Sequence, residues 1–426
     1  MTLRVWVDHR PVGRIAASGD GMSFAYDADV PPELAVSLTM PPRVASYNQH
    51  YGLLPAFDTN IPEGYLKHVI HKYLAKSRGR VTDLDILEMV GGNMIGRVRV
   101  LPEGATPERR DCIPDLGAIL GRKAEAALVT EVMERYGLRS GVSGAMPKAL
   151  LDEADDISER RKTIQTREYI LKFDAADFPG LSLNEYWCLE AARAAGNRTA
   201  EARLGENGDM IAVRRFDARP DGSRLGFEDA AALNGLCSRD KYGTSMETAV
   251  IRNLKPWFGR DALTEMTALY RSLLTSIALR NGDAHLKNFG VLYEDPTQSA
   301  RLSPVYDVVT TTVYIRNDMM AMTLGGSTRW PKPKALEALG ARAGLTRPET
   351  ARIIEEVSEG IRRTLPSMVS AFDRHGLPDL GRAIAAQWNE GLRLSLGKQP
   401  MTIPAPDPFA GASPPEPEAL DTPSPG

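Results

Sequence analysis

The sequence predicts an α+β fold: a small β-rich N-terminal domain, followed by a larger two-lobed domain whose second lobe is mainly helical. Three observations predict it. Short alternating segments separated by turns fill the first hundred residues, which is typical of half-buried strands. After about residue 123, a glycine-bearing turn is followed by further strands. The remainder of the chain consists mostly of amphipathic segments with helical spacing.

The β-rich domain is expected over residues 1–105. Its first strands are LRVWV, GRIAA and MSFAYD, and a second β pair is expected on either side of the turn at residues 91–93. Residues 62–76 are expected to form one helix between these pairs, because apolar side chains recur there at helical spacing after polar start signals.

Composition shifts divide the rest of the chain. Residues 106–122 are rich in proline, glycine and charge, which predicts a linker. A first lobe is expected over 123–222, with a helix, a glycine turn, strands around ALLDE and EYILKF, a helical run from about Asn184 and the strand MIAVRRFD. A helical second lobe is expected over 223–398, where DALTEMTALYRSLLTSIALRN and TARIIEEVSEGIRRTL are the clearest helices. Residues 399–426 are a proline-rich tail that we expect to be disordered.

The composition excludes several classes of protein. The 426 residues carry a formal net charge of -3 and are 42% hydrophobic, so neither a disordered chain nor strong bulk attraction to nucleic acid is expected. The three cysteines, Cys112, Cys188 and Cys237, are far apart and predict no disulfide scaffold and no zinc site. Because no apolar run approaches the length of a membrane span, we expect a cytoplasmic protein.

The most informative string is NGDAHLKN, residues 281–288, between a long apolar helix and the apolar segment FGVLY. In phosphoryl transfer an aspartate orients the attacking hydroxyl, and an asparagine five positions later reaches a magnesium ion. Asp283 and Asn288 have this spacing, and Lys287 could offset charge on the transferred group. A chance D-x-x-x-x-N is common, so the spacing alone is a weak signal.

Further charged residues strengthen this interpretation. The segment LSPVYDVV is expected to place Asp307 at the end of an apolar strand, where a second metal-binding carboxylate is expected, although a turn or helix-capping aspartate would look the same. Lys172 lies in the apolar strand YILKF and must either reach solvent or pair with an anion such as an ATP phosphate. Glu185 and Glu190 on the next helix could pair with Lys172, and we favour Glu185; solvated helix charges are the alternative.

The order of these features along the chain indicates a protein-kinase-like arrangement. Residues 140–148, SGVSGAMPK, join a helix to a strand and have the small side chains that let backbone N–H groups approach a phosphate. This segment is neither a P-loop nor a complete G-x-G-x-x-G motif. The order glycine turn, strand lysine, helix glutamate, linking strand, D-x-x-x-x-N and aspartate is the one that a two-lobed kinase fold requires.

At these residues the sequence resembles the HipA family of toxin kinases, the toxin halves of type II toxin–antitoxin modules. The resemblance covers nearly the whole chain. The motifs that carry it are FDTNIPEG, LEMVGGNMIG, SGVSGAMPKALL, YILKF, AVRRFD, DKYG, NGDAHLKN, LSPVYDVV and MAMTLGG. NGDAHLKN in combination with the later YD is the most specific part.

The resemblance implies a serine/threonine protein kinase that uses ATP and Mg²⁺. It assigns Asp283 as catalytic base, Asn288 and Asp307 as metal ligands, and Lys172 as the ATP-phosphate lysine, with His285 and Lys287 in the catalytic loop. A loop covering the phosphates and a strand beside adenine complete the expected nucleotide site: Val142, Ser143, Gly144, Ala145, Met146, Pro147 and Lys148, then Arg214, Arg215 and Phe216.

Family kinases phosphorylate an aminoacyl-tRNA synthetase, typically the glutamyl enzyme, which stalls translation and produces growth arrest and persistence. The resemblance therefore implies such a synthetase as substrate and a helix-turn-helix antitoxin of the HipB type as partner. Operator DNA would be reached only through the antitoxin complex, and no membrane contact is expected.

The chain departs from the family pattern at two places. Members often carry an autophosphorylated serine where this chain has Gly141, so Ser143 becomes the candidate for self-inactivation, with Ser140 second. The strand beside adenine commonly begins with an acidic residue where this chain has Arg214. Backbone contacts to adenine would survive that change, whereas side-chain contacts to ribose are in question.

Two other functions compete with an active toxin kinase. The chain could act mainly as an antitoxin-binding co-repressor with weak catalysis, but the set of Lys172, Asp283, Asn288 and Asp307 argues against lost catalysis. It could also be a small-molecule kinase of the sugar or aminoglycoside type. That function does not account for the N-terminal β domain or for SGVSGAMPK.

Overall fold

The structure of the chain is a computed structural model. The residues it describes are 1–62, 81–107, 116–136 and 162–402, apart from positions 20, 167, 175 and 176, together with positions 67, 70, 71, 74, 75 and 79. The predicted glycine turn at 140–148, the ALLDE strand, most of the helix predicted at 62–76 and most of the proline-rich tail lie outside the described residues.

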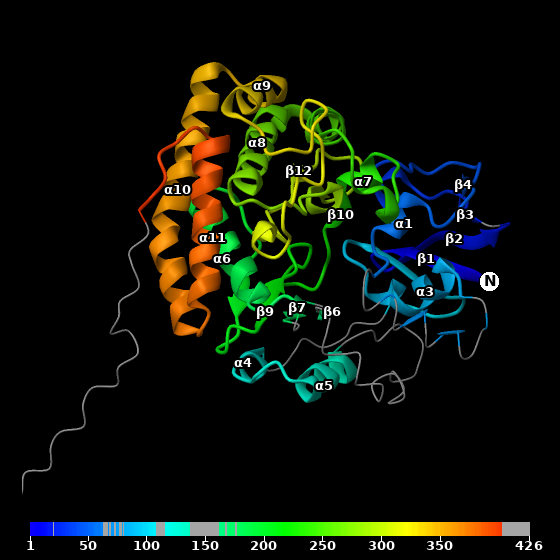
Figure 1. The fold of residues 1–426 in the computed structure, drawn as a ribbon. Coiled ribbons are helices and arrows are strands. Elements are labelled where there is room, and N and C mark those ends of the chain that lie inside the picture. Colours follow the sequence, from blue (N-terminus) through cyan, green and yellow to red (C-terminus); the bar gives the residue numbers. More distant parts are fainter. Residues whose placement is uncertain are drawn as a thin grey trace, which may run out of the picture.

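The N-terminal domain is an antiparallel sheet with a helical cover (Figure 1). Its strand order is β4-β3-β2-β1-β5, with β1 Thr2–Val7, β2 Arg10–Ser18, β3 Gly21–Tyr26, β4 Tyr47–Gln49 and β5 Val98–Pro102. Alternate residues of β1 point into the core, as the period-two pattern predicts. The short helix α1, Pro55–Asp58, and the helix α3, Asp83–Val90, contribute apolar side chains to that core.

The predicted β pair around residues 91–93 is wrong in its first half, because residues 83–90 form helix α3. Thr82 and Asp85 form a reciprocal capping box that starts a helix. The following 3₁₀ turn, Gly91–Asn93, leads towards β5. A Cβ at Gly91 would lie 2.2 Å from the carbonyl oxygen of Val100, so close packing on β5 accounts for this glycine.

The first lobe of the larger domain contains a four-stranded antiparallel sheet, ordered β6-β7-β9-β8. The strands are β6 Lys162–Gln165, β7 Tyr169–Phe173, β8 Ala202–Leu204 and β9 Met210–Arg214. Two helices share a core with this sheet, α4 Leu116–Leu120 and α5 Ala126–Tyr136. Helix α4 falls within the segment predicted as a linker, because its apolar residues pack in that core.

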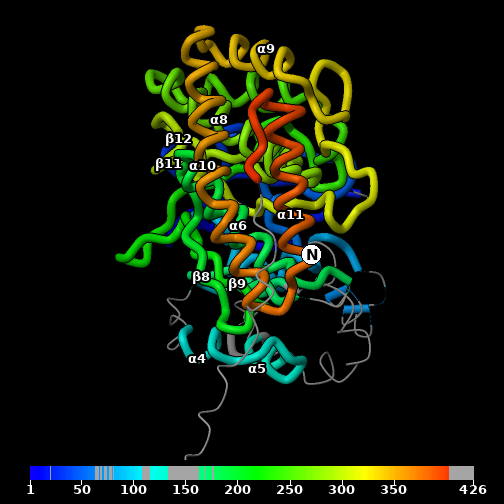
Figure 2. Tube along the Cα trace, turned by 60° about the vertical axis from the view of Figure 1, so that its left-hand side comes forward, coloured from blue at the N-terminus to red at the C-terminus, as the bar shows by residue number. Residues whose placement is uncertain are grey.

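Helix α6, Leu181–Ala194, connects the two lobes by packing. It contacts β8 and β9 of the first lobe and lies beside the long helix α10, Arg347–Arg374, of the second lobe (Figure 2). The same hydrophobic core includes residues of α6, β9 and α10, which fixes the sheet relative to the helices.

The second lobe is mainly helical, as predicted, with a small sheet of order β10-β11-β12. These strands are β10 Gly226–Asp229, β11 Gly290–Tyr293 and β12 Arg301–Leu302. Its other helices are α7 Ala230–Leu233, α8 Ala262–Ala278, α9 Pro333–Ala343 and α11 Pro378–Glu390. Shorter 3₁₀ or π turns of this lobe span Ser238–Asp240, Met246–Arg252, Lys255–Asp261, Leu286–Asn288, Thr311–Val313 and Gly391–Ser395, and one of the N-terminal domain spans Pro32–Leu34.

The architecture confirms the predicted α+β fold, with a β-rich N-terminal domain beside a two-lobed domain. The predicted helices at 261–281 and 350–365 correspond to α8 and α10, and NGDAHLKN lies between α8 and β11. Within the described ranges, no helix is both long enough and apolar enough to cross a membrane.

Candidate active site

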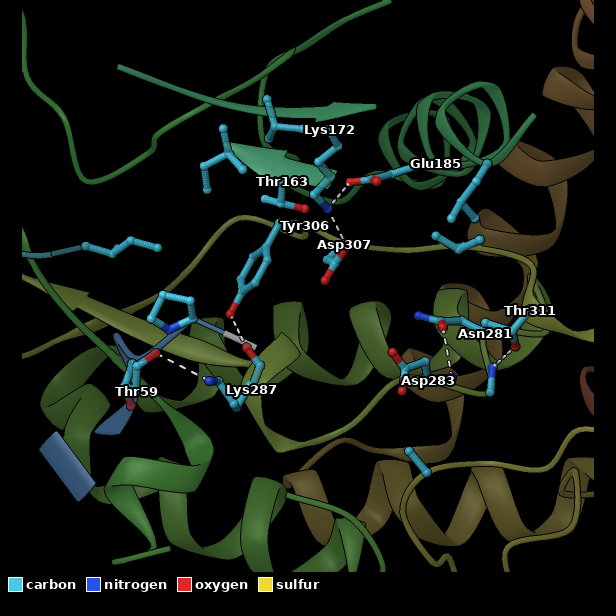
Figure 3. A pocket seen from close by; sticks show the side chains of 18 of the residues that line it. Thr59, Thr163, Lys172, Glu185, Asn281, Asp283, Lys287, Tyr306, Asp307 and Thr311 are labelled. Carbon is cyan, nitrogen blue, oxygen red and sulfur yellow. Dashed lines mark hydrogen bonds and ion pairs between the residues drawn. The ribbon is translucent and has the colours of Figure 1, made fainter. Parts of the chain in front are cut away.

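A cavity of about 1200 Å³ lies where the N-terminal domain and the two lobes meet (Figure 3). Residues 59–62 and Asn93 of the N-terminal domain form part of its wall. The sheet of the first lobe, helix α6, Tyr242 and the loops around residues 281–287 and 306–321 form most of the rest. The predicted residues on its surface are Lys172, Arg214, Arg215, Phe216, Asp283, Lys287 and Asp307.

Lys172 joins two carboxylates at this cavity. Its Nζ donates to Glu185 Oε1 over 2.7 Å and to Asp307 Oδ1 over 2.5 Å. Glu185 is fully buried on α6, which confirms it as the helix partner of Lys172, whereas Glu190 pairs with Arg193 on the same helix. The side chain of Asp307 is 45% exposed, so this cluster keeps one carboxylate accessible.

Asp307 adopts a left-handed backbone conformation, with a φ of 54°. The apolar strand expected before it is shorter than predicted: β12 ends at Leu302, and Val305 forms only an isolated bridge with Thr199. The residue before Asp307 is Tyr306, whose hydroxyl donates to the carbonyl oxygen of Lys287 over 2.5 Å. Burial raises the pKa of Tyr306 well above its ordinary value, which keeps that hydroxyl protonated.

The side chain of Asp283 is exposed to the cavity and accepts a hydrogen bond from Tyr242. The Tyr242 hydroxyl donates to Oδ1 over 2.9 Å. The pKa of Asp283 is raised above its ordinary value, mainly because the surrounding protein desolvates the charged form. The charge of Asp307 raises this pKa further, whereas His285, Tyr242 and Lys241 oppose the change. A raised pKa at a group in a cleft is typical of general bases.

The other residues predicted in the catalytic loop are arranged differently. His285 is buried, its ring packs edge-on against Tyr242, and it does not line the cavity. The amide oxygen of Asn288 accepts a hydrogen bond from the backbone N–H of His285 over 3.0 Å, and this side chain does not line the cavity either. The Nζ of Lys287 points to the N-terminal domain, donating to the carbonyl oxygen of Thr59 over 3.3 Å, and it also donates to Ser238 Oγ over 3.0 Å (Figure 3).

The segment expected beside adenine begins at the end of β9. Arg214 is the last residue of the strand, and its side chain pairs with Glu201 over 2.9 Å. The ring of Phe216 lies 5.2 Å from that of Tyr306, centroid to centroid. Ile170 and Val213 add apolar surface to the same cavity.

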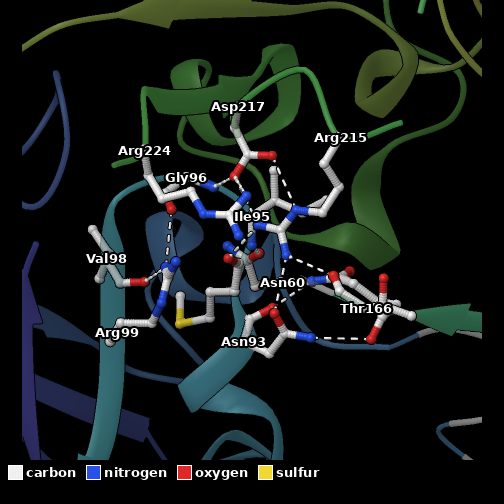
Figure 4. Close-up of polar contacts among 12 residues, drawn as sticks. Asn60, Asn93, Ile95, Gly96, Val98, Arg99, Thr166, Arg215, Asp217 and Arg224 are labelled. Atoms are coloured by element: carbon white, nitrogen blue, oxygen red, sulfur yellow. Dashed lines mark hydrogen bonds and ion pairs between the residues drawn. The ribbon is translucent and has the colours of Figure 1, made fainter. Parts of the chain in front are cut away.

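The side chain of Arg215 leaves the segment and enters the interface with the N-terminal domain (Figure 4). Its guanidinium donates to Asp217 over 2.7 and 3.0 Å, to Asn93 Oδ1 over 3.0 Å, and to the carbonyl oxygens of Met94 and Thr166. Asp217 also accepts from the N–H of Gly96 over 2.9 Å. These contacts indicate that the Arg215 side chain joins the domains. Only the backbone of Arg215 is then available to a ligand in the cavity.

The buried Asp217 has a lowered pKa. Burial alone would raise it, but the charge of Arg215 and its hydrogen bonds, with Arg224 and the N–H of Gly96, outweigh that effect. A second buried carboxylate, Glu228, accepts from Ser37 Oγ over 2.6 Å and from the N–H of Leu38 over 2.7 Å. The N-terminal domain is therefore attached to both lobes by buried, hydrogen-bonded carboxylates.

Comparison with protein families follows the same division of the chain. Residues 3–101 match the family described as HipA N-terminal domain, and residues 140–365 match the family described as HipA-like C-terminal domain. The chain belongs to the HipA family. The matches include every described residue of the cavity cluster, Lys172, Glu185, Asp283 and Asp307.

Two proteins of Sinorhizobium fredii that carry kinase names resemble this HipA-family chain along most of its length. Y4mE is 26% identical over 390 residues, which cover 85% of this chain and 91% of that protein. Y4dM is 27% identical over 405 residues, which cover 85% of this chain and 92% of that protein.

A solved HipA structure has the same fold. It is HipA of the Shewanella oneidensis toxin–antitoxin system, determined in complex with HipB and operator DNA. It aligns with a TM-score of 0.65 at 16% identity, covering 93% of this chain and 98% of that one.

Sequence reasoning missed the residues that complete the site of this HipA-family chain. Tyr242 lies within the DKYG motif, but its contact with Asp283 joins residues 41 positions apart. Thr59 reaches Lys287 from 228 positions away. Neither contact has a local signal, since both depend on how the domains pack. The predicted phosphate loop, residues 142–148 with Ser143, lies outside the described residues.

Proposed function

We propose that this HipA-family chain is the toxin kinase of a toxin–antitoxin pair and transfers the γ-phosphate of ATP to a serine or threonine of a protein. The observation that carries this proposal is the cavity cluster: the Lys172–Glu185 ion pair, the accessible carboxylate of Asp307, and Asp283 within electrostatic reach of it. A strand lysine paired with a helix glutamate is a recurring requirement of protein kinases.

The residues present fit a magnesium-bound nucleotide. Carboxylate oxygens are suitable ligands for Mg²⁺, and Asp307 offers one to the cavity. Lys172 would hold the phosphates in place of its present hydrogen bond to Asp307, while the buried Glu185 retains it. When bound, the metal neutralises charge on the phosphates. Asn288 would have to turn from the N–H of His285 to become a ligand, so its metal role remains a prediction.

The apolar part of the cavity is suited to a nucleotide base. Ile170, Val213 and the rings of Phe216 and Tyr306 provide flat and branched apolar surface next to the segment that ends β9. Backbone groups of residues 214–216 would supply the polar contacts, because the side chains of Arg214 and Arg215 are bound to Glu201 and Asp217.

Asp283 has the setting of a general base for a substrate hydroxyl. It faces the cavity, Tyr242 holds one carboxylate oxygen, and the other is left for the hydroxyl proton. Its raised pKa makes it a stronger base than an ordinary aspartate.

A protein substrate is supported by apolar side chains at the mouth of the cavity. Tyr242, Ile315 and Met319 all line it and are 52%, 49% and 52% exposed. Exposed apolar side chains grouped at one site indicate a surface that binds another macromolecule. The family suggests an aminoacyl-tRNA synthetase, in the first place the glutamyl enzyme, as that protein.

The partner proposed for the chain is an antitoxin of the HipB type. The HipA of Shewanella oneidensis was determined with HipB and operator DNA. We propose the same kind of assembly in the cytoplasm here, with DNA contacted through the antitoxin. Phosphorylation of Ser143 is the corresponding proposal for self-inactivation.

The test is a transfer assay with purified protein, ATP, Mg²⁺ and a panel of aminoacyl-tRNA synthetases. We expect phosphate on a serine or threonine of one synthetase, loss of that product with Asp283→Asn, and growth arrest on expression that the adjacent antitoxin gene relieves. Transfer to a sugar or an aminoglycoside, with none to any protein, would contradict the proposal. Intact-mass measurement after incubation with ATP tests Ser143, and phosphate mapped elsewhere would reject it.

A further inference from the structure

The side chain of Thr311 holds the backbone N–H of Gly282, the residue before Asp283. The N–H of Gly282 donates to Thr311 Oγ1 over 2.7 Å. The Thr311 hydroxyl in turn donates to Asp318 Oδ2, and the carbonyl oxygen of Arg280 lies 3.3 Å away as a second acceptor. The hydroxyl thus accepts one hydrogen bond and donates another, which only serine or threonine could do at this size.

Asp318 packs directly against Gly282. A Cβ on Gly282 would lie 2.0 Å from Asp318 Oδ2, so the contact exists only because residue 282 is glycine. Asp318 is itself fixed, since its carbonyl oxygen accepts from Trp330 Nε1 over 3.1 Å. The guanidinium of Arg280 lies over the Trp330 ring, 4.7 Å from its centre. We call Thr311, Asp318 and Trp330 the clamp, because they contact Arg280 and Gly282 from several sides.

The segment that the clamp holds is strained. Arg280 has a φ of 56°, in the left-handed region, where a non-glycine residue costs about 1–2 kcal/mol. Such a conformation persists only where surrounding contacts favour it. The clamp supplies contacts to the carbonyl oxygen and the side chain of Arg280 and to the N–H of Gly282. Asp283 follows Gly282 directly, and its own N–H donates to Asn281 Oδ1 over 3.2 Å, so the clamp acts on the backbone that leads to Asp283.

We propose that the clamp is the device that positions Asp283 for transfer, with Thr311 as its central positioning residue. The inference rests on the proposed function in one respect, namely that Asp283 acts as the base. A shift of about 1 Å in a catalytic group can lower the rate about 10²-fold without any loss of binding. The clamp should therefore control the rate of transfer and leave nucleotide affinity unchanged.

The kinetic test compares Thr311→Val with Thr311→Ser and Thr312→Val. The valine at 311 keeps the shape, removes the hydroxyl and leaves the N–H of Gly282 without its acceptor. Thr312 is the matched control, because its Oγ1 is buried with no hydrogen-bond partner among the described residues. We expect Thr311→Val to lower kcat about 10- to 100-fold with the KM for ATP within about twofold. Thr311→Ser and Thr312→Val should stay within about threefold of the natural protein.

Three kinetic results would overturn the proposal. In the first, folded Thr311→Val keeps its kcat. In the second, Thr311→Ser lowers kcat as much as Thr311→Val does. In the third, Thr312→Val lowers kcat as much as Thr311→Val does. If the natural protein transfers no phosphate at all, the proposed function fails. Hydrogen exchange then still tests whether the clamp holds the backbone before Asp283.

Hydrogen exchange tests the clamp without reference to activity. A peptide spanning residues 279–285 should exchange faster in Thr311→Val, because the amide of Gly282 has lost its acceptor, and at the natural rate in Thr312→Val. Asp318→Ala serves if Thr311→Val does not fold, and its effect should be smaller because the hydroxyl can still donate to the carbonyl oxygen of Arg280. Unchanged exchange in folded Thr311→Val, or in Asp318→Ala where that variant replaces it, would overturn the proposal.

Discussion

Two charged clusters, the cavity cluster around Lys172 and the interface cluster of Arg215 and Asp217, have a similar arrangement but differ in their accessibility to solvent and ligands. In each, one basic side chain is shared between several acceptors. The interface cluster is closed: the side chain of Asp217 is 1% exposed, and carbonyl or amide oxygens take the remaining donors of Arg215. The cavity cluster is open, since Asp307 is 45% exposed and faces the cavity.

This difference teaches which charges perform chemistry and which maintain structure. A buried ion pair with all its hydrogen bonds made has no capacity left for a ligand, and removing one partner is strongly destabilising. An accessible carboxylate beside a lysine contributes little to stability, because solvent screens it, but it can exchange its partner for a substrate group. The same aspartate-to-asparagine substitution should therefore lower the rate of catalysis in the cavity cluster with little loss of stability. In the interface cluster it should lower stability with little loss of catalysis.

Among the substitutions that compare the two clusters, Asp307→Asn in the cavity cluster should have the largest effect. Loss of this carboxylate should lower phosphate transfer at least about 10²-fold, the loss typical of removing one charge-stabilising group. The free energy of unfolding should change by less than about 1 kcal/mol, because Lys172 retains Glu185. Transfer rates and urea unfolding curves measure the two quantities, with Asp295→Asn, which does not line the cavity, as the control. Equal losses of rate in both variants would contradict the comparison.

Asp217→Asn makes the same chemical change in the interface cluster and should have the opposite outcome. We expect the free energy of unfolding to fall by about 3 kcal/mol, because Arg215 remains buried with its charge uncompensated. Transfer per folded molecule should remain close to that of the natural protein. Urea unfolding together with activity normalised to the folded fraction checks this. A folded, stable Asp217→Asn that has lost transfer would show that the interface cluster is part of the chemistry.

The two clusters should also differ in their response to pH. The pKa of Asp217 is lowered in the folded protein, so its contribution to stability is present above the unfolded pKa and is lost as pH falls through the lower folded value. The pKa of Asp283 is raised, so kcat/KM should begin to fall at a higher pH than for an ordinary aspartate. The free energy of unfolding, measured across acid pH, reports the titration of Asp217, and kcat/KM over the same range reports that of Asp283.

Tyr242→Phe sharpens this pH comparison and is the smallest expected effect. The hydrogen bond from Tyr242 lowers the pKa of Asp283, so its loss should move the acid limb of kcat/KM to still higher pH, with stability unchanged because Tyr242 is half exposed. An acid limb that moves to lower pH would contradict the assigned contact.

The sequence predicted best what local patterns determine. The apolar strand around Lys172 and the helix that follows it favoured Glu185 as the partner of Lys172 over Glu190 or solvated helix charges, and the structure confirms this pair. Residues 87–90 were predicted as a strand, but they lie in helix α3, which begins with a capping box of Thr82 and Asp85 that is visible in the sequence. Arg215 was predicted in the nucleotide site, but its side chain joins the domains.

The rest of the site depends on packing between distant segments. Thr311 reaches Gly282 across 29 positions and Thr59 reaches Lys287 across 228, and neither contact has a sequence spacing that chemistry requires. Helix and strand periodicities specify which face of an element is buried, but they do not specify which element lies opposite. The clamp and the N-terminal wall of the cavity therefore became visible only in the folded chain.

The most direct test of the account is Asp283→Asn, assayed for both transfer and nucleotide affinity. If Asp283 is the base of the open cluster, phosphate transfer should fall about 10³-fold while the Kd for ATP stays within about threefold, because the nucleotide is held by Lys172, Asp307 and the apolar wall. Retained transfer, or loss of ATP binding in step with transfer, would contradict the account.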